Sequence, residues 1–299
     1  MRTREQRIFN IIGHIIMIFL TITAVVPMIL MLISSLTSEP TIVRNGYNFF
    51  PEEWSTYAYR WVFTSNGSLI LRAYGMSFLV TGIGTACSLV ITTLFAYGLS
   101  KKGLPGRGLL TFLVFFTMLF NAGLVPSYMN YTQNFHLKDT FLALIVPNLM
   151  MNAFNVLLMK SYFQTAVPDE ILEAAYIDGA NESRTMLQVA IPLSKPIIAT
   201  IGLFVGIAYW NDWNNGFIYL VKRADLYTIQ NLLNRLMQSI TMLQQNANNL
   251  GNVNEGLAMI PSVTVRMAMA TLGILPIVIV YPFIQNNFVK GITLGGVKG

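Results

Sequence analysis

The chain has 299 residues, of which 54% are hydrophobic and only 11% are charged, and its formal net charge is +6. Soluble domains carry about 25% charged residues, so this composition excludes an ordinary soluble protein and favours a membrane protein with several spans. The excess of Lys and Arg is then better explained by orientation in the bilayer than by nucleic-acid binding. The single cysteine, Cys87, lies in an apolar stretch and has no partner within the chain for a disulfide.

Six stretches are long and apolar enough to cross the hydrocarbon core as helices, which takes about 20 residues. The first follows a basic segment, residues 1–7, and is too long for the core of a signal peptide, so we expect it to be retained. We therefore predict an all-α integral membrane protein, with residues 1–299 forming one transmembrane domain. The predicted spans are about 9–34, 73–99, 109–131, 141–162, 197–220 and 263–288.

Several predicted spans contain proline, which removes a backbone hydrogen bond and bends or breaks a helix. Within a bundle, neighbouring helices can satisfy the carbonyl groups that proline leaves free. We expect kinked helices around a central cavity, although bends without any function explain each proline equally well. The prolines in question are Pro27, Pro126, Pro147, Pro276 and Pro282.

Positive charge predicts the orientation of these spans. Six spans place both termini on one side, and cytoplasmic loops are richer in Lys and Arg than outer loops. The basic N-terminus and the loop at 101–107, which has three basic residues and no acid, place both termini in the cytoplasm. Two long segments then lie outside: residues 35–72, with several aromatic residues, and residues 221–262, a polar helix followed by an Asn-rich stretch.

Residues 161–195 form a long cytoplasmic loop whose pattern predicts two short helices. Pro168 followed by two acidic residues is typical of a helix start. Apolar residues then recur at helical spacing, and Gly179 suits the left-handed turn that ends a helix. Asn181 or Ser183 can cap the second helix. We therefore expect two helices joined by a glycine elbow, an object suited to a cleft on a partner.

The same loop resembles the EAA loop of importer-type ABC transporter permeases. The family pattern is Glu-Ala-Ala, three residues, Gly, nine residues, an aliphatic residue, one residue, then Leu-Pro. This chain matches the spacing throughout, with Val and Ile replacing the usual Ile and Leu. The matching residues are Glu173, Ala174, Ala175, Gly179, Val189, Ile191 and Pro192.

The resemblance implies that this loop couples transport to ATP hydrolysis. In the family it docks into a groove on a cytoplasmic ATPase subunit and moves when two ATPases close on ATP. Glu173 would contact the ATPase and Gly179 would permit the turn. The alternative is an amphipathic hairpin lying on the membrane surface, but its apolar face is small and lacks the Lys and Arg that such helices use.

The family also implies a set of partners. These are a second homologous permease subunit that completes a heterodimer, two cytoplasmic ATPase subunits, and an extracytoplasmic substrate-binding protein, which residues 221–262 could contact. The C-terminal tail, residues 287–299, would reach the ATPases. This chain has no phosphate-binding P-loop, so it is not an enzyme itself, and ATP and Mg²⁺ would be bound by the ATPases. The location is the bacterial plasma or inner membrane.

The chain resembles carbohydrate permeases of the maltose-transporter type at residues 209–213 and in the tail from Phe288 to Gly299. Within that family, the resemblance is to a branch associated with oligosaccharides and polysaccharide fragments. Amides, a carboxylate and aromatic faces can bind sugar hydroxyls and rings, and an acid within a span is costly unless it faces water or a partner. Alternatively, Asp212 caps a broken helix or pairs with the partner permease. The candidate substrate path is Trp210, Asn211, Asp212, Trp213, Asn214 and Asn215, and weaker candidates are Asn121, Asn148 and Asn152.

Three other classes of protein fit the sequence less well. An ion-coupled secondary transporter would need titratable residues along its spans, where only Asp212 and His14 are found. A membrane enzyme would need an acid–base or metal constellation, and no His or Cys cluster suggests one. An ABC permease for amino acids or metals is disfavoured by the Trp-Asn-Asp-Trp segment and the glycine-rich tail.

Overall fold

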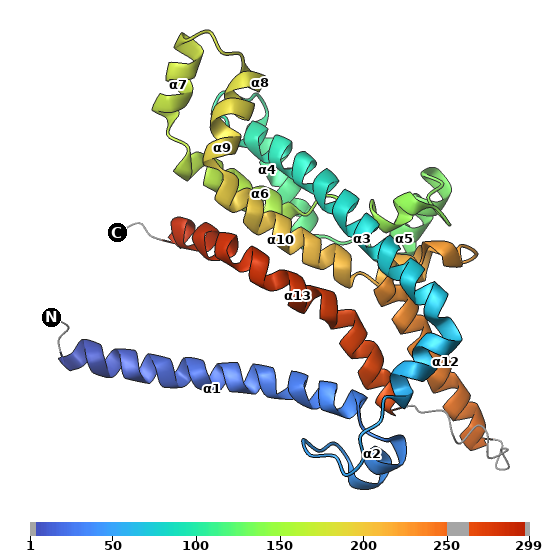
Figure 1. Cartoon of the computed structure of the whole chain (residues 1–299). Helices are drawn as coiled ribbons and strands as arrows, with labels where there is room; N and C mark the ends of the chain where they lie inside the picture. The colour runs from blue at the N-terminus through green and yellow to red at the C-terminus, as the bar shows by residue number, and fades with distance from the viewer. Residues whose placement is uncertain (1–3, 250–262, 297–299) are drawn as a thin grey trace. The chain divides into compact units, whose positions relative to one another are not determined.

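The computed structural model describes residues 4–249 and 263–296. Within these ranges the chain is helical, and its one β-type pairing is an isolated bridge between Thr37 and Trp54 (Figure 1). The chain divides into two compact units: unit 1 is Met1–Ser68 with Arg235–Pro276, and unit 2 is Leu69–Asn234 with Ile277–Gly299. The Asn-rich end of the predicted outer segment, from residue 250, and the last three residues of the tail lie outside the described residues.

The helices follow one another with few long connections. Short π-helical segments span Asn130–Asn134 and Met186–Ala190, and 3₁₀ turns span Phe141–Leu144 and Ala224–Leu226. The α-helices are α1 (Arg4–Ser35), α2 (Glu39–Asn45), α3 (Tyr57–Ser100), α4 (Arg107–Leu119), α5 (Leu124–Met129), α6 (Ala153–Ala166), α7 (Asp169–Ile177), α8 (Glu182–Thr185), α9 (Ile191–Leu193), α10 (Lys195–Asn211), α11 (Asn214–Tyr219), α12 (Ile229–Asn249) and α13 (Val263–Gly296).

Three of these helices are long and apolar enough to cross a membrane: Ile8–Ser35 in α1, Gly67–Ser100 in α3 and Val263–Pro282 in α13. Two further helix pairs qualify only as bent spans. The path is bent by 117° between Arg107–Leu119 and Leu124–Asn134, and by 79° between Glu182–Leu193 and Lys195–Asn211. Among the described residues there are thus at least three apolar spans, and the count of six remains a prediction.

The predicted span at 141–162 differs most from the structure. A 3₁₀ turn ends at Leu144, and α6 begins only at Ala153. Between them, Pro147 has no N–H to donate to a helix, and Asn148 adopts a left-handed backbone conformation with φ of 63°. The expected single helix is therefore two short pieces separated by irregular backbone.

In unit 1, α1 is apolar on all sides. Its side chains are widely exposed, for example Phe9 at 77% and Phe19 at 66%. A helix of this kind requires lipid or another protein around it. By contrast, the start of α13 is held within the unit: the Glu39 carboxylate accepts hydrogen bonds from the backbone N–H groups of Val263 and Thr264, both at 2.9 Å. A carboxylate at a helix N-terminus satisfies unpaired donors and complements the helix dipole.

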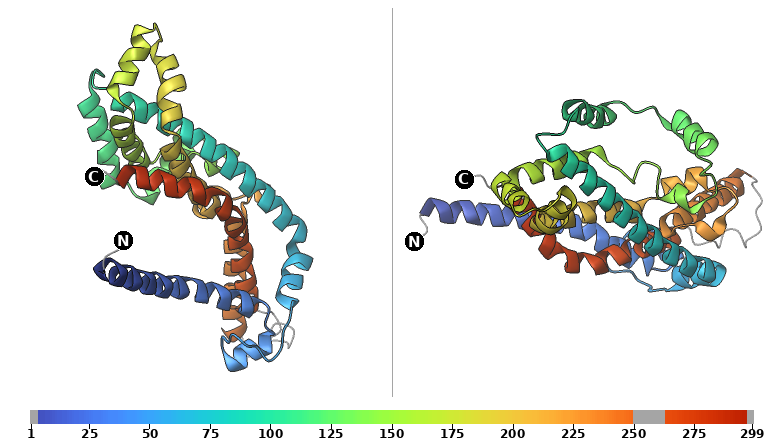
Figure 2. Two further views of the ribbon diagram at one scale, coloured as in Figure 1. Left: turned by 60° about the vertical axis from the view of Figure 1, so that its left-hand side comes forward. Right: turned by 90° about the horizontal axis from the view of Figure 1, so that it is seen from above.

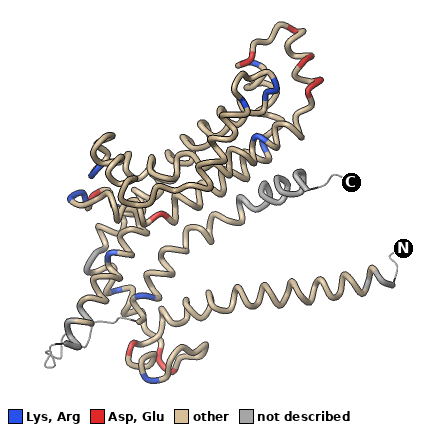
Figure 3. Tube along the Cα trace, turned by 180° about the vertical axis from the view of Figure 1, so that it is seen from behind, with Lys and Arg blue, Asp and Glu red and all other residues tan. Residues whose placement is uncertain are grey.

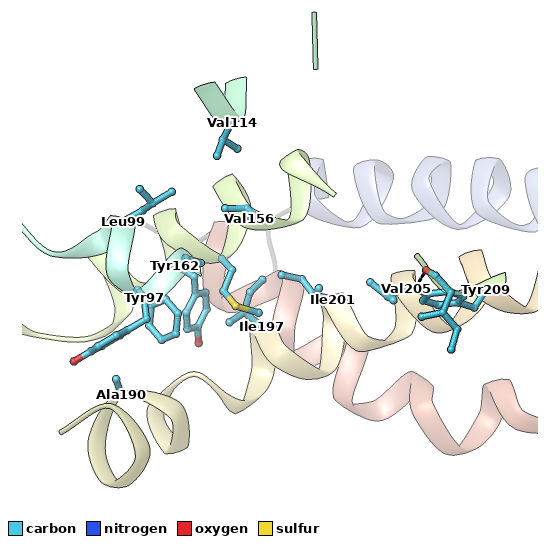
Figure 4. Close-up of a cluster of buried hydrophobic side chains, with 14 of the residues drawn as sticks. Tyr97, Leu99, Val114, Val156, Tyr162, Ala190, Ile197, Ile201, Val205 and Tyr209 are labelled. Carbon is cyan, nitrogen blue, oxygen red and sulfur yellow. Dashed lines mark hydrogen bonds between the residues drawn. The ribbon is translucent and has the colours of Figure 1, made fainter. Parts of the chain in front are cut away.

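In unit 2, one apolar cluster connects α3, α4, α6 and α10 (Figure 4). Its fully buried members include Leu99 of α3, Val156 and Met159 of α6, and Ile201 of α10. Tyr209 closes one end of the cluster, and its hydroxyl donates a 2.8 Å hydrogen bond to the Ile145 carbonyl. The cluster fixes the helices that carry both candidate sites.

Small residues let α3 and α10 approach closely, as is typical of helix pairs in membranes. A Cβ added at Gly84 of α3 would lie 2.6 Å from Cζ of the Tyr209 ring. That ring is 1% exposed and held by its hydrogen bond to Ile145, so it has no room to move aside. Gly82, two residues earlier, has nothing within 4 Å of such a Cβ.

We predict that Gly84→Ala lowers the stability of the protein, because overpacking a filled contact costs about 1–3 kcal/mol. The measurement is the apparent Tm of the purified complex in detergent. The matched control Gly82→Ala should leave the Tm unchanged. Equal Tm values for the two variants would show that the α3–α10 contact is not tightly packed.

Candidate functional site

The coupling loop (residues 161–195) contains two helices joined at Gly179. Pro168 precedes α7, and Asp169 and Glu170 occupy its first turn, where acids complement the helix dipole. Gly179 has φ of +83°, and its N–H donates to the Tyr176 carbonyl at 3.0 Å. This left-handed turn ends α7, because only glycine adopts it without a steric penalty.

The second helix of the coupling loop begins at a side-chain cap. Asn181 accepts a 2.8 Å hydrogen bond from the backbone N–H of Arg184. The helix is then segmented into α8, the π-helical turn Met186–Ala190, and α9. Figures 1 and 2 show α7 and α8 projecting together beyond the ends of α3 and α6. The loop is therefore an ordered protrusion.

The seven motif residues of the loop divide into an exposed and a packed group. Glu173, Ala174 and Gly179 are exposed, Ala175 is half-buried, and Ile177 beside them is 86% exposed. Val189 and Ile191 are half-buried and flank the fully buried Ala190, which belongs to the apolar cluster, while Pro192 is exposed. The α7 half of the motif can thus meet another protein, and the second half anchors the loop.

Charges gather at this end of unit 2, whereas the helices of the apolar cluster carry few (Figure 3). Lys102 pairs with Asp169 at 2.7 Å, and the hydrogen bond from Lys102 lowers the pKa of the Asp169 carboxyl. Lys101 lies 3.0 Å from Glu182. Sequence reasoning used the two lysines only as orientation signals and missed these contacts, because residues 101 and 182 are distant along the chain.

The second candidate site is the break between α10 and α11. Asp212 lies in the break, and its Oδ1 accepts hydrogen bonds from the backbone N–H groups of Asn214 at 3.1 Å and Asn215 at 3.3 Å. These N–H groups begin α11 and have no partner within that helix. The carboxylate therefore acts as a helix cap in this structure.

The break is further held by polar side chains that reach freed carbonyl groups. Asn231 donates to the Trp213 carbonyl at 3.0 Å, and Asn215 donates to the Pro147 carbonyl at 3.0 Å. On a neighbouring loop, Asp139 accepts from the N–H groups of Lys222 and Val221, which holds the pKa of its carboxyl below the usual value. Two irregular segments of unit 2 are thus tied to each other and to the start of α12.

The six residues predicted to line the substrate path do not share one environment. Trp210 is 5% exposed and packs against Phe78, with 5.2 Å between ring centroids. Asn215 is 1% exposed, and Asp212 is half-buried. Asn211, Trp213 and Asn214 are exposed, Trp213 at 41%. Of the six, only these last three are classed as exposed.

The weaker asparagine candidates lie at helix breaks. Asn121 accepts a 2.8 Å hydrogen bond from the Gly123 N–H, and Asn152 caps α6 by accepting from the Asn155 N–H at 3.2 Å. Asn148 is the left-handed residue after Pro147. The local hydrogen bonds of Asn121 and Asn152 explain those two side chains without a ligand. Among the residues that the structure describes, no group of three His, Cys, Asp or Glu side chains could hold a metal ion.

Known proteins provide an independent comparison. No family model matches the chain. It is 35% identical over 295 residues to the polygalacturonan/rhamnogalacturonan transport system permease protein YtcP of Bacillus subtilis (strain 168), covering 99% of this chain and 100% of that protein. It is 25% identical to the arabinooligosaccharides transport system permease protein AraQ of the same organism, covering 98% and 97%.

The fold also matches a solved structure. A chain in the crystal structure of a bacterial ABC transporter involved in the import of the acidic polysaccharide alginate superposes with a TM-score of 0.75. The two chains are 30% identical, and the match covers 96% of this chain and 99% of the other. The chain therefore belongs to the ABC transporter permease proteins, in the group that includes these polysaccharide and oligosaccharide permeases, and is a multi-pass protein of the cell membrane.

Proposed function

We propose that this chain is one membrane subunit of an ATP-driven importer that carries an oligosaccharide into the cytoplasm. The observation that supports this most is the ordered protrusion of α7 and α8, which exposes Glu173 and Ile177 and turns at Gly179. The names of the related permeases, which refer to polygalacturonan, arabinooligosaccharides and alginate, support a carbohydrate as the substrate.

In this proposal the chain crosses the membrane six times, with kinked helices around a central cavity and both termini in the cytoplasm. The bent pair Arg107–Leu119 and Leu124–Asn134 supplies one of these crossings, and Lys195–Asn211, the half of the second bent pair that follows the coupling loop, contributes to another. The coupling loop seats on a cytoplasmic ATPase subunit, and two such subunits bind ATP and Mg²⁺. A second, homologous permease completes the pore, and an outer binding protein delivers the sugar.

The substrate path runs past the α10–α11 break. Asp212, Asn215 and Trp210 hold the break in shape, and the exposed Asn211, Trp213 and Asn214 offer amides and an aromatic face to the sugar. Aromatic side chains supply large apolar area together with a polar edge, which suits sugar rings that have an apolar face and a hydroxyl rim. Buried side chains that fix exposed ones are the usual construction of a binding site.

We predict that uptake by the complete complex in vesicles requires ATP and persists when a proton uncoupler is added, because the energy comes from hydrolysis on the partner subunits. The measurement is accumulation of a radiolabelled oligosaccharide from plant or algal polysaccharide. Loss of uptake on adding the uncoupler, with ATP still present, would instead support an ion-coupled secondary transporter.

We predict that Gly179→Val abolishes uptake while the subunit remains in the membrane. A left-handed conformation costs a residue with a side chain about 1–2 kcal/mol, and a β-branched residue tolerates it worst. Gly179→Asn is the matched control, since asparagine enters this region readily, and it should keep most of the uptake. Normal uptake by the valine variant would exclude the elbow as a required turn.

We predict that Asp212→Asn keeps both stability and uptake, because the amide oxygen can still cap α11. Asp212→Ala should lower the free energy of unfolding by about 0.5–2 kcal/mol, the typical cost of losing a cap. Apparent Tm and initial uptake rate are measured for both variants. A stable Asp212→Asn protein without uptake would show that the carboxylate charge itself meets the substrate or the partner permease.

A further inference from the structure

Four polar side chains connect the coupling loop to the end of α3: Tyr97, Lys101, Tyr176 and Glu182, named here the Glu182 cluster. Glu182 Oε1 accepts a hydrogen bond from Tyr97 Oη at 2.8 Å and lies 3.0 Å from Lys101 Nζ. Tyr176 Oη donates to Glu182 Oε2 and accepts from Lys101 Nζ at 2.9 Å. One carboxylate thus joins α7 and α8 to α3.

The α3 end of the cluster is firmly anchored. Tyr97 is 5% exposed, and its ring packs edge-on against Phe163 of α6 with 5.5 Å between centroids. Figure 4 shows its hydroxyl at the margin of the apolar cluster, pointing away from the other labelled side chains. Because the ring is fixed in the core, any displacement of Glu182 acts on α3 and α6.

On the side of the coupling loop, α7 is attached to the apolar cluster more weakly than α3 is. No residue of α7 is buried, and Leu172 is only partly buried where it packs against the apolar cluster. Glu182 lies three residues after the elbow at Gly179, so it holds the loop close to its turning point. Without this contact α7 could tilt about the elbow with little disturbance to the core, because the buried Thr185 and Ala190 hold only the second helix.

The cluster is ionic at neutral pH. The Lys101 ammonium lies 4.6 Å from the centroid of the Tyr97 ring and 5.4 Å from that of Tyr176. Burial alone would lower the pKa of Lys101, but hydrogen bonds with Tyr176, Tyr97 and Glu182 raise it above its ordinary value. Hydrogen bonds that involve charged groups are about twice as strong as neutral ones.

A second ion pair at the same end of unit 2 provides a contrast. Lys102 and Asp169 are 2.7 Å apart, but their side chains are 80% and 61% exposed. In the Glu182 cluster the Glu182 side chain is 56% exposed, but the Lys101 side chain is only 24% exposed. Exposed pairs contribute little because water and salt screen them. Of the two pairs, only the one that includes Lys101 is built into the packed end of α3.

Resting on the function proposed above, we propose that Glu182 is a positioning residue that transmits movement of the coupling loop to α3. When the ATPases move the loop, the Glu182 cluster makes α3 follow and prevents the two helices from tilting at the elbow. Glu182 is not one of the seven residues that match the loop motif.

The test uses the reconstituted complex and measures oligosaccharide uptake and ATP hydrolysis in the same vesicles. Glu182→Gln should lower uptake per ATP hydrolysed about ten-fold, corresponding to the loss of one charge-assisted hydrogen bond, while hydrolysis continues. Asp169→Asn removes the same charge from the same loop and should leave the ratio unchanged. Equal ratios for the two variants would overturn the proposal. A parallel fall of uptake and hydrolysis in Glu182→Gln would also overturn it, because Glu182 would then serve only the docking of the loop on the ATPase.

A second variant decides the question if Glu182→Gln does not assemble. Tyr97→Phe keeps the buried ring and removes only the hydroxyl, so it should lower the same ratio without loss of assembly, and an unchanged ratio overturns the proposal.

The double variant Lys101→Met with Glu182→Gln should lower the ratio no further than either single change, because the effects of residues in direct contact do not add. Additive losses count against the cluster. Absence of uptake in the parent complex would instead contradict the proposed function.

Discussion

Irregular backbone inside an apolar segment must have its N–H and C=O groups satisfied, and the arrangement of unit 2 depends on this constraint. Pro147 interrupts one segment and Asp212 lies in the interruption of another. Tyr209 and Asn215 donate to carbonyls of the first, and Asn231 donates to a carbonyl of the second. The polar residues of these apolar helices are therefore explained first by backbone hydrogen bonding.

The same constraint separates structural side chains from exposed ones at the α10–α11 break. Asp212 and Asn215 use their polar atoms on the backbone, whereas Trp213 and Asn214 are exposed beside them. A short helix held in this way gives the exposed side chains fixed positions. The coupling loop follows an analogous plan, because the buried Ala190 and Tyr97 anchor a protrusion whose α7 face is exposed.

Local signals in the sequence were sufficient for the helical class, the long apolar helices α1, α3 and α13, and the turn at Gly179. Each depends on composition or on the conformational preference of one residue. The division of the span predicted at 141–162 was not visible, because hydropathy does not report whether a proline bends a helix or ends it. The Glu182 cluster was missed for a different reason: Tyr97 and Glu182 meet only through tertiary packing.

Docking of the coupling loop on an ATPase subunit is the central claim of this account. Photo-crosslinking tests it most directly, with a photoreactive phenylalanine derivative in place of Ile177, which is 86% exposed at the end of α7. In membranes that contain the complete complex, docking predicts an adduct with the ATPase subunit. Adducts with membrane lipid, and none with an ATPase subunit, would contradict it and show that the loop lies on the membrane surface.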